Sequence, residues 1–211
     1  MRLHILVPTK RFDEAKQRLA PALDDHRRRV LSRAMLTGVL RAAARAGGAG
    51  GRWVVGGDQE VADLCAREGW AWLPELGRDL NETLVRAVAR CAAAGAGGVL
   101  ILPADLPLLR AADVETVLAA WRPGRAVLVR SRDGAGTNAL VLPAAGTGAL
   151  WFGPGSADLH RGGLEARGLE VVEMEVPGIA ADLDVPADLA RLAADERFPG
   201  DLRALVGART P

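Results

Sequence analysis

The stretch VLILPADLPLL, residues 99–109, decides the predicted fold of this chain. Its four apolar residues Val99–Leu102 run without a polar break, which is typical of a central parallel strand that is buried on both faces. The run ends at Pro103, and Asp105 follows just beyond the carboxyl end of the strand. Open α/β sheets place their ligand crevices at this end. Asp105 is therefore either a ligand-binding carboxylate or a group that caps the next helix.

Length and charge bound the classes of function. The chain has 211 residues, 49% hydrophobic and 25% charged, which is enough to bury a full core. We predict a single domain over residues 1–194, followed by a surface tail over residues 195–211 with one weak helix. Lys and Arg number 27 against 26 Asp and Glu, so no global field attracts nucleic acid or an anionic membrane surface. An anionic ligand must therefore be met locally.

The cysteines and the apolar runs indicate the compartment. Cys65 and Cys91 lie in separate helical patterns without metal-ligand spacing, so we expect small core residues. The first apolar run, residues 3–7, is too short for a signal peptide, and no later run approaches the ~20 residues of a membrane span. We expect a cytoplasmic protein that binds neither nucleic acid nor membrane. No obligate protein partner is evident.

Strands and helices are predicted to alternate along the chain. The expected strands are residues 3–7, 53–55, 70–73, 99–102, 125–129, 139–142 and 169–176. The expected helices are residues 24–46, 59–68, 111–121 and 157–161, one near Asn81 and one after Pro186. The run GGAGG, residues 47–51, is expected to be a loop. About seven strands alternating with helices predict an α/β fold, a three-layer sandwich around a mixed, mostly parallel sheet.

Two features are candidate contacts to a nucleotide. The loop PTKRFDEAKQRLAP, residues 8–21, follows the first strand and carries the basic residues Lys10 and Lys16. A basic loop at the carboxyl end of a strand can bind phosphates, although such side chains also occur as solvated surface. Asn81 lies near the start of a later helix, where its amide either caps the helix or reads the edge of a base.

A glycine-rich turn is a candidate anion site. In FGPGSADLHRGGL, residues 152–164, Gly153 and Gly155 bracket a proline, and Ser156 is placed to cap the next helix. Backbone N–H groups, a hydroxyl and the positive end of the helix then converge where phosphate or carboxylate binds readily. His160, over the same helix face, is either a further contact or a core residue.

Thr137 and a pair of aspartates complete the candidate site. Thr137 lies in DGAGTNALVL, residues 133–142, beside glycines that let a ligand approach the backbone closely. It is therefore either a ligand contact or an ordinary strand residue, and the sequence favours neither. Asp182 and Asp184 are two apart, so in extended backbone both carboxylates could face one cation, although this motif is short and common. Carboxylates, bases and an anion pocket suit metal-assisted phosphoryl chemistry better than acyl transfer, because no Ser or Cys has a plausible His partner.

These motifs resemble a known family. VPTKRFDEAKQRLAP, LPADLPLL, DGAGTNALVL, FGPGS and DLDVPADL, in this order over roughly residues 5–190, resemble the 2-phospho-L-lactate or phosphoenolpyruvate guanylyltransferases of coenzyme F420 biosynthesis. The resemblance implies a nucleotide-diphospho-sugar transferase-like fold. It also implies transfer of GMP from GTP to a phosphorylated three-carbon acid, with release of pyrophosphate.

The resemblance also implies roles for individual residues. Mg²⁺ would be bound by Asp105, Asp182 and Asp184. The acceptor acid would be bound by Thr137, Gly153 and Ser156. The nucleotide would be bound by Lys10, Asn81 and Asp105, and catalysis would rest on Lys10, Lys16 and Asp105.

The resemblance has departures and alternatives. Relatives tend to read GLN where this chain has Asp79-Leu80-Asn81, and often have an aromatic residue and a base within residues 157–159. One alternative is a nucleotidyltransferase acting on molybdopterin or a sugar phosphate, but the LxGGxSxRMG-type loop expected of such an enzyme is absent from this chain. Two others are a non-catalytic metal-dependent GTP-binding module and a glycosyltransferase that uses the Asp182-x-Asp184 motif. The Ala-, Arg- and Gly-rich composition resembles bacterial members, which favours phosphoenolpyruvate over 2-phospho-L-lactate as acceptor.

Overall fold

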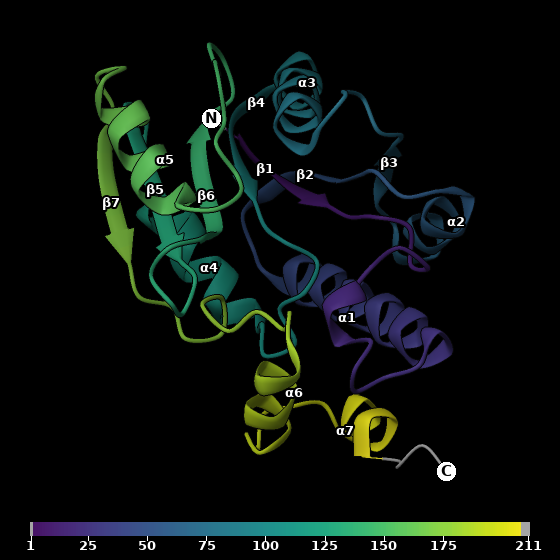
Figure 1. Ribbon diagram of the computed structural model, residues 1–211. Coiled ribbons are helices and arrows are strands. Elements are labelled where there is room, and N and C mark those ends of the chain that lie inside the picture. Colours follow the sequence, from purple (N-terminus) through teal and green to yellow (C-terminus); the bar gives the residue numbers. More distant parts are fainter. Residues whose placement is uncertain (1, 208–211) are drawn as a thin grey trace.

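The strands form one mixed sheet in a computed structural model that describes residues 2–207 (Figure 1). They are β1 (Arg2–Pro8), β2 (Ala49–Val55), β3 (Ala71–Leu73), β4 (Ala96–Ile101), β5 (Arg125–Arg130), β6 (Thr137–Pro143) and β7 (Glu170–Met174). Their order is β3-β2-β1-β4-β6-β5-β7, and β6 is antiparallel to both of its neighbours while the other pairs are parallel. The predicted mixed, mostly parallel sheet is confirmed.

Helices cover both faces of the sheet. They are η1 (Gln17–Leu19, a 3₁₀ turn), α1 (Asp25–Arg45), α2 (Gln59–Glu68), α3 (Leu80–Ala93), α4 (Ala111–Ala120), α5 (Ser156–Glu165), α6 (Pro186–Ala193) and α7 (Gly200–Gly207). The core under α1, α2 and α4 is separate from the core under α3 and α5. This is the predicted three-layer sandwich. No helix within residues 2–207 is long and apolar enough to cross a membrane.

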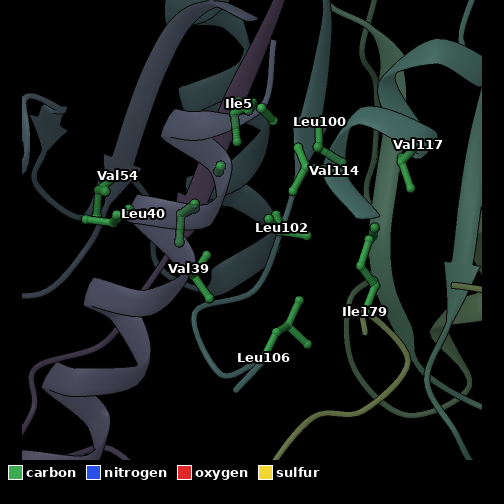
Figure 2. Packing of buried hydrophobic residues seen from close by; sticks show 14 of the residues in the cluster. Ile5, Val39, Leu40, Val54, Leu100, Leu102, Leu106, Val114, Val117 and Ile179 are labelled. Carbon is green, nitrogen blue, oxygen red and sulfur yellow. The ribbon is translucent and has the colours of Figure 1, made fainter. Parts of the chain in front are cut away.

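The central strand β4 supplies side chains to both cores. Leu100 and Leu102 pack on the side of α1 and α4 (Figure 2), whereas Val99 and Ile101 pack on the side of α3 and α5. Successive side chains of a strand point to opposite faces, so a strand that is covered on both sides needs an unbroken apolar run. The run 99–102 is therefore apolar because β4 lies in the middle of the sheet.

The last three residues of the glycine run 47–51 belong to β2, so the prediction of a loop is wrong for them. β2 begins at Ala49, and Gly51 pairs with His4 of β1. A Cβ atom on Gly51 would lie 2.8 Å from the His4 ring. Glycine is required here because the neighbouring side chain takes the space.

The carboxyl-terminal segment differs from the predicted surface tail. Phe198 and Leu202 are buried in a cluster with Leu31 of α1 and Leu189 of α6. A short helix gains stability by burying its apolar face, and α7 does so against α1. Residues 208–211 of the predicted tail lie outside the described residues.

The two cysteines are core residues, as predicted. Both are free and buried, Cys65 in α2 and Cys91 in α3. Burial raises the pKa of Cys65 to about 11 and that of Cys91 to about 12. Both thiols are therefore protonated and unreactive at neutral pH.

Candidate active site

Asp105 lies just beyond the carboxyl end of the central strand, as predicted. The backbone N–H of Leu183 donates to the carbonyl of Asp105 at 3.2 Å, which ties residues 182–184 to the loop after β4. Asp182 and Asp184 line the same cleft, and Asp184 shares the Lys16 ammonium with Asp105. The structure thus brings the three predicted carboxylates to one edge of the sheet.

Lys16 joins two of these carboxylates. Its Nζ donates to Oδ2 of Asp105 at 2.6 Å and to Oδ1 of Asp184 at 2.8 Å, and its side chain is only 9% exposed. Burial lowers the pKa of Lys16, but the attraction of the two carboxylates outweighs it, so the pKa lies above its ordinary value. Lys16 has a φ of 55°, a left-handed conformation that costs a non-glycine residue about 1–2 kcal/mol.

Asn138 positions the third carboxylate. Its Nδ2 donates to Oδ1 of Asp182 at 3.1 Å and to the carbonyl of Ile179 at 3.0 Å. Burial is the main reason that the pKa of Asp182 is raised, and this hydrogen bond opposes the shift. Sequence reasoning did not select Asn138 as a site residue, although its position directly after Thr137 at the start of β6 was the available signal.

The carboxylates suit a hard cation. Mg²⁺ prefers oxygen ligands, and Oδ1 of Asp105 is buried without a hydrogen-bond partner among the described residues. The Lys16 ammonium already places a positive charge between Asp105 and Asp184. Within residues 2–207, no set of three or more His, Cys, Asp or Glu side chains is arranged to hold a metal ion. Mg²⁺ commonly takes one or two protein carboxylates and keeps several waters, so a cation here would compete with the Lys16 ammonium for Asp105 and Asp184.

Two adjoining clefts open beside these carboxylates. The smaller, which we call the lysine cleft, has a volume of about 500 Å³, and its lining includes Lys10, Lys16 and Asp105. The larger, the serine cleft, has a volume of about 800 Å³, and its lining includes Thr137, Gly153, Ser156, Asp182 and the arginine Arg132. Both clefts are lined by Arg18, Leu80 and Asp184. A ligand in one cleft would therefore lie beside a ligand in the other.

The glycine-rich turn borders the serine cleft, but its helix begins one residue earlier than predicted. Gly153 has a φ of 132° and Gly155 a φ of 70°, which side chains other than glycine rarely adopt. Gly155 is the N-cap of α5, and Ser156, the first helical residue, makes no capping hydrogen bond. The prediction that Ser156 caps the helix is wrong. Ser156, which is 2% exposed, lies instead in the first turn of α5, at the positive end of the helix and in the lining of the serine cleft.

Asn81 holds the chain that leads into this turn. Its Nδ2 donates to the carbonyl of Phe152 at 3.0 Å, and its Oδ1 accepts from the Phe152 N–H at 2.7 Å. The N-cap of α3 is Asp79, whose carboxylate accepts from the N–H of Glu82. Asn81 lines neither cleft. Neither the predicted base contact nor the alternative helix cap is supported by this geometry.

Three basic side chains are available to anions. Lys10 is exposed at the lysine cleft, Arg132 at the serine cleft and Arg18 where the two clefts adjoin. None of the three forms an ion pair with a residue in the described part of the chain. Arg132 was missed by sequence reasoning, although it directly precedes the DGAGTN motif. Each cleft therefore has at least one cationic side chain that an anionic ligand could meet, beside the carboxylates that line it.

Comparisons with known proteins show the family of the chain. Residues 3–194 match the family described as "Guanylyl transferase CofC like". The chain is 39% identical over 195 residues to phosphoenolpyruvate guanylyltransferase of Rubrobacter xylanophilus. These residues cover 92% of this chain and 95% of the relative. It is 36% identical over 188 residues to 3-phospho-D-glycerate guanylyltransferase of Phenylobacterium zucineum, and this match covers 85% of this chain and 84% of the relative.

A solved structure shows the same fold. A Desulfovibrio desulfuricans protein described as a nucleotide-diphospho-sugar transferase superposes with a TM-score of 0.78 over 98% of both chains, at 18% identity. At this identity the likeness concerns the fold alone, whereas the match over residues 3–194 concerns the family. The chain is thus a nucleotidyltransferase and belongs to the CofC-like guanylyltransferase family.

Proposed function

We propose that this protein transfers GMP from GTP to phosphoenolpyruvate in coenzyme F420 biosynthesis. The observation that carries the proposal is the pair of clefts that meet at Asp184. One cleft offers lysines to a nucleoside triphosphate, and the other offers a helix N-terminus and hydroxyls to a small anion. The guanylyl group and the acid follow from the names of relatives such as that of Rubrobacter xylanophilus.

The reaction needs positioning more than proton transfer. An oxygen of the acceptor phosphate forms a bond to the α-phosphorus of GTP, and the bond from that phosphorus to the β-phosphate oxygen breaks. The electron pair leaves with pyrophosphate. The acceptor oxygen is already anionic, so no general base is required. The protein's task is to hold the two substrates in line and to lessen the repulsion between them.

Each cleft supplies groups for one substrate. Lys10 and Lys16 would bind the phosphates of GTP in the lysine cleft. In the serine cleft, the backbone after Gly153 and the hydroxyls of Thr137 and Ser156 would bind the acceptor. A phosphorylated acid carries a second anionic group, and the free guanidinium of Arg132 in the same cleft would meet it.

Mg²⁺ would be bound by Asp105, Asp182 and Asp184. When bound, it would neutralise charge on the reacting and leaving oxygens. Lys16 would then be released from Asp105 and Asp184, and its ammonium would be available to phosphate.

Pyrophosphate release tests the proposal. The purified protein is supplied with GTP, ATP, CTP or UTP, together with phosphoenolpyruvate, 2-phospho-L-lactate or 3-phospho-D-glycerate, with Mg²⁺ or with EDTA. We expect release with GTP and phosphoenolpyruvate in the presence of Mg²⁺. Absence of release with every pair, or release that ignores the acid, would overturn the proposal. A tenfold advantage of another acid in kcat/KM would overturn only the choice of acceptor.

A further inference from the structure

We propose that His160, buried behind the serine cleft, is a positioning residue that turns the hydroxyl hydrogen of Thr137 toward the acceptor. This inference rests on the proposed function, because it concerns how the same site holds its acceptor. It adds a residue that touches neither cleft and acts only through Thr137.

Both ring nitrogens of His160 have partners. The ring is fully buried, with Nδ1 at 3.0 Å from Oγ1 of Thr137 and Nε2 at 3.1 Å from the backbone nitrogen of Trp151. The Phe152 ring packs edge-on against it, with centroids 4.6 Å apart. The imidazole therefore has one defined orientation between α5 and the start of β6.

The Trp151 contact decides which nitrogen carries the proton. A backbone N–H can only donate, so Nε2 accepts and carries no hydrogen. Burial lowers the pKa of His160 to about 4, against a smaller opposing effect of the Ser156 backbone, so the ring is neutral at pH 7. Its single proton must then lie on Nδ1. The Nδ1–H group therefore donates to Oγ1 of Thr137.

This donation determines what the Thr137 hydroxyl can do. With His160 donating to its oxygen, the hydroxyl cannot give its own hydrogen back to the ring. Within residues 2–207, no second partner of this hydroxyl is found, and Thr137 lines the serine cleft. Its hydrogen is therefore left for a ligand, and an anionic oxygen of the acceptor is the group that would take it. Hydrogen bonds in such a chain also polarise one another.

Neighbouring residues hold the chain of donors in place. A side chain at Gly163 of α5 would collide with the ring of Trp151, so glycine leaves the space in which Trp151 packs. Asn81 binds the backbone of Phe152, the next residue, from the other side. The N–H that sets the tautomer of His160 is thus held by packing on one side and by hydrogen bonds on the other.

A double-mutant cycle tests the role in the reaction. In His160→Gln, the amide oxygen can still accept from Trp151, but nothing replaces Nδ1. We expect Thr137→Val to lower kcat/KM for phosphoenolpyruvate by about 10-fold or more, the effect of losing a hydrogen bond to a charged group, and His160→Gln to lower it less, because the hydroxyl itself remains. The KM for GTP should not change. The double variant should be no worse than Thr137→Val alone, because His160 acts through that hydroxyl.

Controls and opposing outcomes sharpen the cycle. Thr137→Ser keeps a hydroxyl and should remain sensitive to His160→Gln, whereas the exposed His26→Gln in α1 should behave as the wild type. The positioning role would be overturned if the losses of kcat/KM in the two single variants simply added in the double variant. A comparable rise in the KM for GTP would also overturn it.

The tautomer can be measured without any turnover. Nitrogen NMR on the ¹⁵N-histidine-labelled wild type resolves the 3 histidines of the chain, and the His160→Gln variant assigns the signal. We expect a neutral ring protonated at Nδ1 from pH 8 to pH 6. A ring protonated at Nε2, or a cation at pH 7, would overturn the inference. A wild type that transfers no GMP would refute the proposed function, whereas transfer with the wrong tautomer would refute only the role of His160.

Discussion

The two clefts are built by different forces. The lysine cleft is held by charge, since Lys16 binds Asp105 and Asp184 through ion pairs. The serine cleft is held by neutral groups, because Asn81 and His160 bind the backbone at Phe152 and Trp151. A cation or a phosphate can replace a partner of an ion pair, whereas no small ligand replaces these backbone contacts. We therefore expect the lysine cleft to rearrange when ligands bind, and the serine cleft to be preformed.

Asp105→Asn should have the largest effect, because it removes a predicted metal ligand on the charged side. We expect kcat to fall by about 10³-fold, which corresponds to the several kcal/mol that a metal ion contributes to transition-state charge stabilisation. The fold should remain intact by circular dichroism. Asp201→Asn, at an exposed position in the first turn of α7, is the matched control. Activity near that of the wild type at saturating Mg²⁺ would show that Asp105 is no ligand.

Lys16→Met tests whether the charged side depends on its ammonium. The substitution leaves Asp105 and Asp184 without their shared donor, so we expect the free energy of unfolding to fall by about 1–3 kcal/mol without metal. Mg²⁺ should raise the Tm of this variant more than that of the wild type, because no ammonium has to be displaced. Turnover should fall about 10²-fold through the lost charge on the phosphates.

Thermal unfolding with and without Mg²⁺ measures the stability loss of Lys16→Met and its Mg²⁺ response. Arg29→Met, which removes an exposed base from α1, is the control. An equal Mg²⁺ response in the wild type and in Lys16→Met would contradict the expected competition between the ammonium and the metal.

Ser156→Ala should act on the acceptor alone. Loss of one hydrogen bond to a charged group costs about 1.5–3 kcal/mol, so the KM for phosphoenolpyruvate should rise by about 10-fold or more while the KM for GTP stays the same. Because Gly155 is the helix cap, we expect no loss of Tm from capping. Initial rates with each substrate varied in turn provide the measurement. An effect confined to GTP would mean that the substrates occupy the opposite clefts.

Asn81→Ala should have the smallest effect on rate. It leaves the N–H and carbonyl of Phe152 without their partners, so we expect a loss of about 1–3 kcal/mol in the free energy of unfolding and a modest rise in the acceptor KM. Asn81→Asp keeps the hydrogen bond from the Phe152 N–H but sets a second acceptor against the Phe152 carbonyl, so it should not rescue the stability. The ratio of GTP to ATP activity should not move. A change in that ratio would restore Asn81 as a base contact.

Local sequence patterns were sufficient for the layers and for the turns at DGAGTN and FGPGS, but not for the glycine run 47–51. The apolar run 99–102 required a strand covered on both faces, because side-chain direction alternates along a strand. The glycines of DGAGTN and FGPGS marked the turns, because left-handed backbone excludes most side chains, and Gly134, Gly153 and Gly155 do have positive φ values. Both effects act between near neighbours in the chain, so one sequence displays them.

The tertiary structure alone decided the partners of the polar side chains. Lys16 lies 89 residues from Asp105 and 168 from Asp184, and Asn81 lies 71 residues from Phe152. Nothing in the local sequence distinguishes a lysine that binds phosphate from one that binds carboxylates, or an amide that reads a base from one that holds backbone. Polar groups that become buried must find hydrogen-bond partners, and these meet only after the sheet has brought distant segments together.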